Sequence, residues 1–519
     1  MNKLQHEAIR YMFLLFFIAF LSVPIIGSFW NSQYISFESL AYLKSHYGKP
    51  VVLTLVLGIV VSLLTLFWAS CALFSIKQLS GKTKRTLLIF ALLPLLFPPY
   101  IGAITYIDIF KSPTFLTLVG RSSFIEFIQA SFVFSLFLYP YVFLLFYSRL
   151  RMISPAQESI IALYKLSWWK KLVLFYIPHL KYAGFSGILL VFLYTISDFG
   201  AASILRLHTL TIQIYQEIIG RFNHSEAAFV SFLYIIFTAT AIFMGQKLLG
   251  EPTSAYKTEK KYSDIQSGSF FTACIALLFL SLLIFLSVGL PMGKIGIWFY
   301  QYLVDASYLK SVWITAKQDI FFVGLTSFMV TLGVTLGMLF STFFFSALIH
   351  KKTESLSATP YYLASMLHGL PGIVIVFGLL VIKQTLPSTD IMAWIIFLSG
   401  YFYRYIGIAF VVIEPAIAAI PKNYTAIAAI FTRGKFSHIR YVSLPLTKNA
   451  LLHAGNYIFF NGLRELVIPL LLLPLGVEVL SMRIWQVASE GLYSYASPAI
   501  FLLLFLSLPS LVLFVKNKI

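Results

Sequence analysis

Long apolar stretches recur along the whole chain, and they constrain its fold more than any other feature. The chain has 519 residues, of which 59% are hydrophobic and only 11% are charged. Soluble domains carry about 25% charged residues. Because a protein core cannot bury this much apolar surface, we expect lipid to cover much of it. The sequence therefore predicts an all-α polytopic membrane protein.

Twelve stretches are long enough to cross a bilayer, which requires about 20 largely apolar residues. The first follows a basic start and is not followed by a cleavage site, so we expect a retained span. Pro98, Pro99, Pro371 and Gly372 predict interruptions that are candidate hinges, with simple packing kinks as the alternative. The predicted spans are residues 11–30, 51–75, 87–110, 124–147, 182–203, 226–246, 269–290, 318–347, 359–382, 391–413, 449–473 and 495–515.

Lysine and arginine are unevenly distributed between the segments that connect these spans. With the N-terminus in the cytoplasm, 25 of them fall in cytoplasmic segments and 11 on the opposite side, while Arg404 and Arg464 lie inside spans. This bias predicts that both termini are cytoplasmic. It also accounts for the net charge of +19 without a nucleic-acid partner.

The chain divides into two halves with six predicted spans each. A polar stretch rich in Lys, Ser and Thr, residues 247–268, lies between them and is predicted to be a cytoplasmic linker. We therefore expect a first repeat over residues 1–246 and a second over residues 269–519. Because both halves have the same predicted topology, the repeats should be parallel and related by a pseudo-twofold axis along the membrane normal.

Matching residues in the two halves support this internal duplication. When Pro178 is aligned with Pro445, Asp198 aligns with Glu465 in the same register. Further on, the sequence LTIQIYQ matches LSMRIWQ in a slightly shifted register, which indicates a short insertion in the second half. An acid matched to an acid, a shared proline and a shared aromatic-Gln pair are not explained by apolar composition alone.

Several of these segments resemble a known family. The stretches LPLLFPPYIGAITYI, LYPYVFLLFYSRLR, TISDFGAASIL, LRELVIPLLLLP and RIWQVASEGLYSYA are similar to the permease subunits of binding-protein-dependent ABC importers, most of all the fused ferric iron permeases. The resemblance implies the type I importer fold with twelve transmembrane helices, in a bacterial inner membrane. It also implies two ATPase subunits on the cytoplasmic side, an extracytoplasmic substrate-binding protein and no cofactor. Thiamine and phosphonate permeases share this architecture.

In that family each half carries a cytoplasmic loop with the pattern E-A-A-x3-G-x9-I-x-L-P, which contacts the ATPase. Here the loops keep their place and terminal proline, but not the acid and glycine. Ser159 and Lys165 occupy those positions in the first loop, and Ala426 and Thr432 in the second. The resemblance implies coupling residues Glu158, Ser159, Lys165, Trp168, Pro178, Thr425, Ala426, Thr432, Gly434 and Pro445.

The start of the first loop also has a local helix signal. In SPAQ, Ser154 is suited to the N-cap, Pro155 to the first helical position and Gln157 to closing a capping box. An amphipathic helix of about two turns is predicted. The resemblance implies that it docks into a groove of an ATPase subunit, whereas packing on its own membrane helices or among headgroups is the alternative.

Nucleotide chemistry is not predicted for this chain. Asp-Phe-Gly at residues 198–200 lacks the other kinase motifs, and Gly-Lys-Thr at 81–83 lacks the first glycine of a phosphate-binding loop. No His/Cys cluster has zinc-ligand spacing. We expect no enzymatic activity in the chain itself, so that transport would draw energy from a separate ATPase.

Three charged residues inside spans are candidate functional groups, because a charge at mid-membrane costs about 3 kcal/mol or more. Asp198 and Glu465 are predicted to lie symmetrically in an outward-facing vestibule, with oxygens that could bind a cation such as ferric iron transiently. The structural alternative is that Glu465 pairs with Arg464 or Arg404 while Asp198 caps a broken helix. Arg404 is expected to pair with a carboxylate or with helix carbonyls, and pathway contact is its alternative.

Two other classes of function remain open at this point. An ion-coupled secondary transporter would use the two acids as coupling sites, and a membrane scaffold would transport nothing. A secondary carrier needs no paired docking helices, and a scaffold needs no symmetric buried acids. The cytoplasmic loops and the acids therefore favour the importer.

Overall fold

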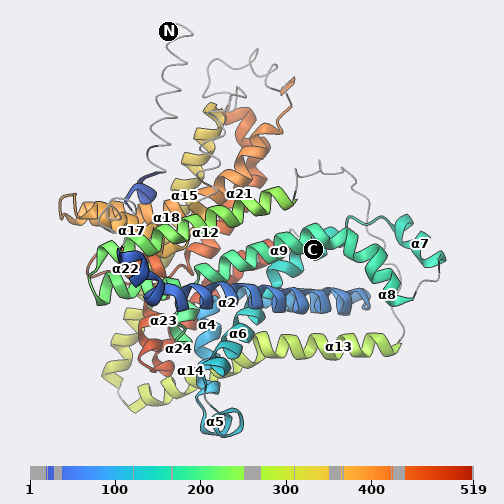
Figure 1. Ribbon diagram of the computed structural model, residues 1–519, viewed down its shortest axis with the longest axis horizontal. Coiled ribbons are helices and arrows are strands. Elements are labelled where there is room, and N and C mark those ends of the chain that lie inside the picture. Colours follow the sequence, from blue (N-terminus) through green and yellow to red (C-terminus); the bar gives the residue numbers. More distant parts are fainter. Residues whose placement is uncertain are drawn as a thin grey trace.

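The computed structural model describes residues 19, 22–27, 38–120, 122–164, 167–249, 270–308, 310–349, 364, 367–421, 423–424 and 439–516. Every regular element within these ranges is helical (Figure 1). The first half contains α2 (Glu38–Lys77), α3 (Gly81–Leu92), η2 (Leu93–Leu96), α4 (Pro99–Phe110), α5 (Pro113–Val119), α6 (Ser123–Leu150), α7 (Pro155–Leu163), α8 (Trp168–Lys171), η3 (Leu172–Tyr176), α9 (Ile177–Ser197), α10 (Gly200–Ile204), α11 (Leu210–Tyr215), η4 (Gln216–Gly220) and α12 (His224–Leu249).

The second half has a similar order of elements. It contains α13 (Phe270–Ile284), η5 (Phe285–Gly289), α14 (Leu290–Tyr308), α15 (Lys310–Ile349), α17 (Gly372–Lys383), α18 (Asp390–Ala418), η6 (Ile439–Ser443), α21 (Leu444–Gly462), α22 (Val467–Leu472), α23 (Leu480–Ser489) and α24 (Tyr493–Lys516). Segment η2 is a 3₁₀ turn, whereas η3 to η6 are π-helical. The predicted linker at 247–268 lies largely outside the described residues.

Eight helices of the described part are long and apolar enough to cross a membrane, and a bent pair raises this to nine. A multi-pass membrane protein is therefore confirmed. The number twelve stays a prediction, because most of the first predicted span lies outside the described residues and the apolar helix in the described part of the ninth, Gly372–Lys383, is short. Two predicted spans are wrong as continuous helices: 182–203 is interrupted after Ser197, and 449–473 is interrupted between Gly462 and Val467.

The predicted interruptions at the prolines are present. Helix α3 with η2 meets α4 at an angle of 88°. Pro98 precedes α4 with φ −57° and ψ 143°, and Pro371 precedes α17 with φ −56° and ψ 140°. Both residues are extended because proline fixes φ and has no N–H to continue a preceding helix. The role of these interruptions as hinges stays a prediction.

Elements of the two halves correspond in the register seen in the sequence. The π-helical segments η3 and η6 begin at Leu172 and Ile439, which are equivalent when Pro178 is aligned with Pro445. Helices α4 and α17 each have 12 residues. Helices α6 and α18 begin with equivalent side-chain caps, because Ser122 accepts a hydrogen bond from the N–H of Ile125 and Thr389 accepts one from the N–H of Met392.

Equivalent side-chain hydrogen bonds also recur. The hydroxyl of Thr54 accepts from the Leu210 N–H at 3.0 Å, and that of Ser327 accepts from the Leu480 N–H at 2.8 Å. These bonds satisfy the first N–H groups of α11 and α23, which have no partner within their own helices. The same positions therefore perform the same structural task in both halves.

The helices form two similar groups, one in each half, and helices also pack across the two halves. Helices α2, α6 and α9 pack together, as do α15, α18 and α21. In Figure 1 the first group lies in the middle of the view and the second lies above it. Helix α13 of the second half packs on α2, and α12 of the first half packs on α17. Each half therefore packs against a helix of the other half.

We expect Ser327→Ala to lower the free energy of unfolding by about 1 kcal/mol, since it leaves the Leu480 N–H without its acceptor. Thermal unfolding of the purified protein in detergent measures this change. Thr326→Val is the matched control, because the Thr326 hydroxyl is exposed and bonds only to the Phe322 carbonyl of its own helix. Equal melting temperatures for the two variants would contradict the assigned role.

Candidate translocation site

The first half contributes Asp198 from a break between two helices. Helix α9 ends at Ser197, and Asp198 is extended with φ −74° and ψ 128°. Its Oδ1 accepts hydrogen bonds from the N–H groups of Ala201 at 2.7 Å and Ala202 at 3.4 Å. Asp198 therefore caps the short helix α10, as one of the two sequence alternatives expected.

Close packing explains the glycine that follows. A Cβ placed on Gly200 would lie 3.0 Å from both Tyr100 Cβ and Leu466 Cδ2. Tyr100 belongs to α4 of the first half, and Leu466 precedes α22 of the second. A larger residue at position 200 would push these two segments apart. The break at Asp198 is thus held against both halves.

The second half contributes Glu465, which is hydrogen-bonded and paired. Its Oε2 accepts from the Tyr405 hydroxyl at 2.8 Å and lies 3.8 Å from Arg404 Nε. The side chains of Arg404 and Glu465 are 18% and 11% exposed, so neither lines an open vestibule in this conformation. Of the two partners expected from the sequence, the structure selects Arg404 rather than Arg464.

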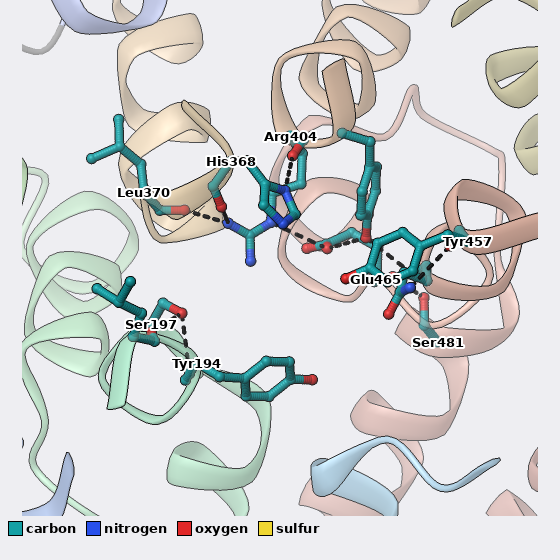
Figure 2. Close-up of polar contacts among 11 residues, drawn as sticks. Tyr194, Ser197, His368, Leu370, Arg404, Tyr457, Glu465 and Ser481 are labelled. Carbon is teal, nitrogen blue, oxygen red and sulfur yellow. Dashed lines mark hydrogen bonds and ion pairs between the residues drawn. The ribbon is translucent and has the colours of Figure 1, made fainter. Parts of the chain in front are cut away.

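Arg404 also satisfies the end of the helical segment before Pro371. Its Nη1 donates to the carbonyl oxygens of Leu370 and, at 3.4 Å, His368 (Figure 2). In return, His368 Nδ1 donates to the Arg404 carbonyl oxygen at 3.1 Å. Carbonyls at a helix end lack partners within the helix. Arg404 thus has both contacts that the sequence suggested, a carboxylate and helix carbonyls.

The two acids are electrostatic neighbours. The carboxylate of Asp198 interacts with the charges of Glu465 and Arg404. Their backbone carbonyls have equivalent partners, since Thr211 donates to the Asp198 oxygen at 3.0 Å and Ser481 donates to the Glu465 oxygen at 2.5 Å. The sequence alignment of Asp198 with Glu465 therefore places two residues in matching local structures at one site.

Tyrosine and tryptophan residues surround this pair. The hydroxyl of Tyr100 has Arg464, Glu465 and Asp198 as its charged neighbours. In Figure 2 the side chain of Tyr194 extends from α9 toward the Arg404–Glu465 group. Sequence reasoning missed these aromatic residues because they have no distinctive spacing. The one sequence feature that could have indicated them is their position on segments that are matched between the two halves.

Trp485 joins the two halves at the same level. Its Nε1 donates to Ser203 Oγ at 2.8 Å, and its ring lies 5.8 Å from the ring of Phe199 and 6.4 Å from that of Tyr215. Tyr215 and Trp485 occupy equivalent positions in the match of LTIQIYQ with LSMRIWQ. The aromatic contact therefore joins two residues that the sequence alignment of the halves matches. The pseudo-twofold axis stays a prediction.

Arg464 does not form the ion pair that was one alternative for it. Its guanidinium lies over the Phe460 ring, with 4.5 Å from Cζ to the ring centroid. Within the described part of the chain, its Nε and Nη1 have no hydrogen-bond acceptor. A cavity of about 30 Å³, the volume of about one water molecule, lies nearby between the halves. It is lined by Leu95, Tyr141, Asn456, Tyr457, Phe460, Asn461, Ser510 and Leu511.

The coupling loops are described only in part. The capping box is confirmed, since Gln157 Oε1 accepts from the Ser154 N–H at 3.0 Å and Ser154 Oγ accepts from the Gln157 N–H at 3.3 Å. Ser159, Pro178 and Pro445 are exposed. Outside the described residues lie Lys165, Thr425, Ala426, Thr432 and Gly434, together with the side chains of Glu158 and Trp168.

Helix α7 of the first loop presents apolar residues to solvent. Ile160 is 53% exposed and Leu163 is 79% exposed. After the loop, η3 is held against the end of α2, because Lys77 is hydrogen-bonded to the Tyr176 hydroxyl. The segment that follows the loop therefore contacts α2 as well as continuing into α9.

Among the described residues, no group of three or more His, Cys, Asp or Glu side chains is arranged to hold a metal ion. The carboxylates of Asp198 and Glu465 already have protein partners. Their transient contact with a cation stays a prediction.

We expect Asp198→Asn to leave the stability of the protein nearly unchanged, because an asparagine oxygen caps helices as well as aspartate does. Asp198→Ala removes the acceptor for Ala201 and should cost about 1 kcal/mol. Thermal unfolding of the two variants distinguishes these results. If asparagine and alanine destabilised the protein equally, the carboxylate would not act as a cap.

Comparison with known proteins identifies a relative of this chain. No family model matches the chain. A curated protein of Haemophilus influenzae, described as "Fe(3+)-transport system permease protein FbpB 2", is 25% identical over 341 residues. The match covers 64% of this chain and 65% of the relative, so it spans less than two thirds of the relative's length. The resemblance to ferric iron permeases indicated by the sequence motifs is thereby confirmed.

Proposed function

We propose that the chain is the permease subunit of an ABC importer, with two six-span repeats fused in one polypeptide. The single observation that carries this proposal is the match to the Fe(3+)-transport permease. The corresponding elements of the two halves support a parallel duplication, with repeats at 1–246 and 269–519. The distribution of Lys and Arg supports a bacterial inner-membrane protein with both termini in the cytoplasm.

In this proposal, two ATPase subunits bind the loops that precede Pro178 and Pro445. The exposed apolar side chains of α7 are suited to a groove on such a subunit, because they have little contact within the chain itself. Each loop leads through a π-helical segment into α9 or α21. When the ATPases close on ATP, the loops would move these helices and thereby the breaks at Asp198 and Glu465.

Ferric iron is the proposed cargo, and this assignment rests on the description of the Haemophilus influenzae relative as an Fe(3+)-transport permease. A substrate-binding protein would deliver it on the extracytoplasmic side. Asp198 and Glu465 lie beside a contact between the halves, where a passage would open when the halves separate. Their present hydrogen bonds support a first task in holding the helix breaks. Contact with the cargo would follow if opening releases those bonds.

Copurification of an ATPase with the chain tests the coupling proposal. We expect an ATPase subunit to copurify with the intact chain and to be lost when residues 156–170 and the equivalent loop before Pro445 are both scrambled. Scrambling α5 is the control, because this short helix lies on a different connection. Retention of the ATPase after both loops are scrambled would reject these loops as the coupling sites.

Uptake of labelled ferric iron and labelled thiamine by cells expressing the full system tests the cargo. We expect iron uptake, and a reduction of at least tenfold in the double variant Asp198→Asn, Glu465→Gln at normal protein level. Glu478→Gln is the control, since Glu478 pairs with Arg483 at the surface. Thiamine uptake without iron uptake would overturn the cargo, and full iron uptake by the double variant would overturn the role of the acids.

A further inference from the structure

Three oxygen-bearing side chains converge at the end of α2 that lies far from the coupling loops. The Tyr47 hydroxyl lies 2.9 Å from Glu217 Oε1 and is also hydrogen-bonded to Glu226 Oε2. Tyr47 comes from α2, Glu217 from η4 and Glu226 from the first turn of α12. Three separate elements thus bring a phenol and two carboxylates to one point.

The Tyr47 hydroxyl has too few hydrogen atoms to donate to both carboxylates. A tyrosine hydroxyl has one hydrogen, and ionised carboxylates have none. Both contacts of Tyr47 therefore cannot be ordinary hydrogen bonds unless one carboxyl group carries an additional proton. A phenol oxygen beside two carboxylate oxygens, with too few protons between them, is suited to a hard cation, since such ions bind carboxylate and other oxygen ligands.

Burial and charge also favour a cation site at these three side chains. The Glu217 side chain is completely buried, and within the described residues its Oε2 has no hydrogen-bond donor. Its cationic partner is Arg221, whose Nη1 lies 2.6 Å from Oε1. That guanidinium is 49% exposed and also contacts His46 Nε2 at 3.2 Å. Among the described residues, Arg221 is therefore the cationic partner of Glu217 alone, and a buried oxygen of Glu217 remains available.

The fold does not need these polar groups for packing. In the register that pairs Tyr215 with Trp485, the second half has Val487 in place of Glu217 and Ala496 in place of Glu226. Ala496 is fully buried. The equivalent helix α23 also lacks the π-helical turn that η4 forms around Glu217.

The tyrosine is likewise missing from the second half. In the register that pairs Thr54 with Ser327, Ile320 stands in place of Tyr47. All three members of the cluster thus have apolar counterparts. The cluster is an addition to one half of a scaffold that is otherwise built with apolar residues.

We propose that Tyr47, Glu217 and Glu226 form a binding site for a hard metal cation, of which ferric iron is the best match. Binding would release the phenol proton, and any proton held by a carboxyl group, to water, with no change in oxidation state. A trivalent ion with one phenolate, two carboxylates and Arg221 has a net charge of +1, and water completes its coordination.

The position of the site suggests where it would act. Tyr47 and Lys77 lie near opposite ends of α2, separated by about 45 Å along a straight helix. Lys77 contacts η3, which follows the first coupling loop, so Tyr47 lies at the opposite membrane surface. That the bound ion is cargo arriving from outside rests on the proposed import function. The cation site itself is independent of that function.

Visible absorption of the purified full-length chain in detergent tests the site. Ferric iron is added as a weak chelate. Tyrosinate bound to iron(III) produces a visible charge-transfer band, which is the signal measured. We expect the band to saturate at about one iron per chain, to vanish in Tyr47→Phe and to require at least tenfold more iron in Glu226→Gln. Tyr234→Phe is the matched control, since this buried tyrosine donates to the Ile196 carbonyl rather than to a carboxylate.

Absence of the band in the unaltered protein, or its persistence in Tyr47→Phe, would overturn the proposal. If Tyr47→Phe does not fold, the iron titration of Glu226→Gln tests the site instead. Glu226 is partly exposed, so its substitution should disturb the fold less. A missing band together with normal iron uptake removes this site and leaves the importer intact. A band together with uptake of thiamine alone removes iron as the cargo and leaves the cation site intact.

Discussion

Backbone polar groups that lipid cannot satisfy are the constraint on which the rest of this structure depends. A chain that crosses a membrane must pair every buried N–H and C=O group within the protein. Here the helices break in several places, and side chains from neighbouring segments close the breaks at the site. Asp198 accepts from the start of α10, Thr54 and Ser327 accept from the starts of α11 and α23, and Arg404 donates to the carbonyls before Pro371.

This constraint explains why the charged residues inside the spans are found where they are. A carboxylate or a guanidinium within the membrane is costly, but a helix end supplies N–H or C=O groups that offset part of that cost. Asp198 and Arg404 each combine a charge with such an end. The same breaks lie at the contact between the halves, so the groups that stabilise the fold also lie at that contact.

The two halves keep the same scaffold while differing in polar chemistry. Equivalent hydroxyls at 54 and 327, and at 211 and 481, make equivalent bonds. In contrast, Phe137 stands at the position equivalent to Arg404. The Tyr47 cluster is likewise confined to the first half. Hydroxyls that satisfy backbone groups therefore recur at these two pairs of positions, whereas Arg404 and the Tyr47 cluster each occur in one half.

Sequence patterns alone determined the helical membrane class, the proline interruptions, the capping box at Ser154 and the alignment of Asp198 with Glu465. These features are local or periodic, because they depend on apolar run length, on proline geometry and on short motifs. Tertiary structure alone decided that Arg404 rather than Arg464 pairs with Glu465, that two predicted spans are broken, and that Tyr47 meets Glu217 and Glu226. Such contacts join residues as far as 179 positions apart, and only the packing of helices brings them together.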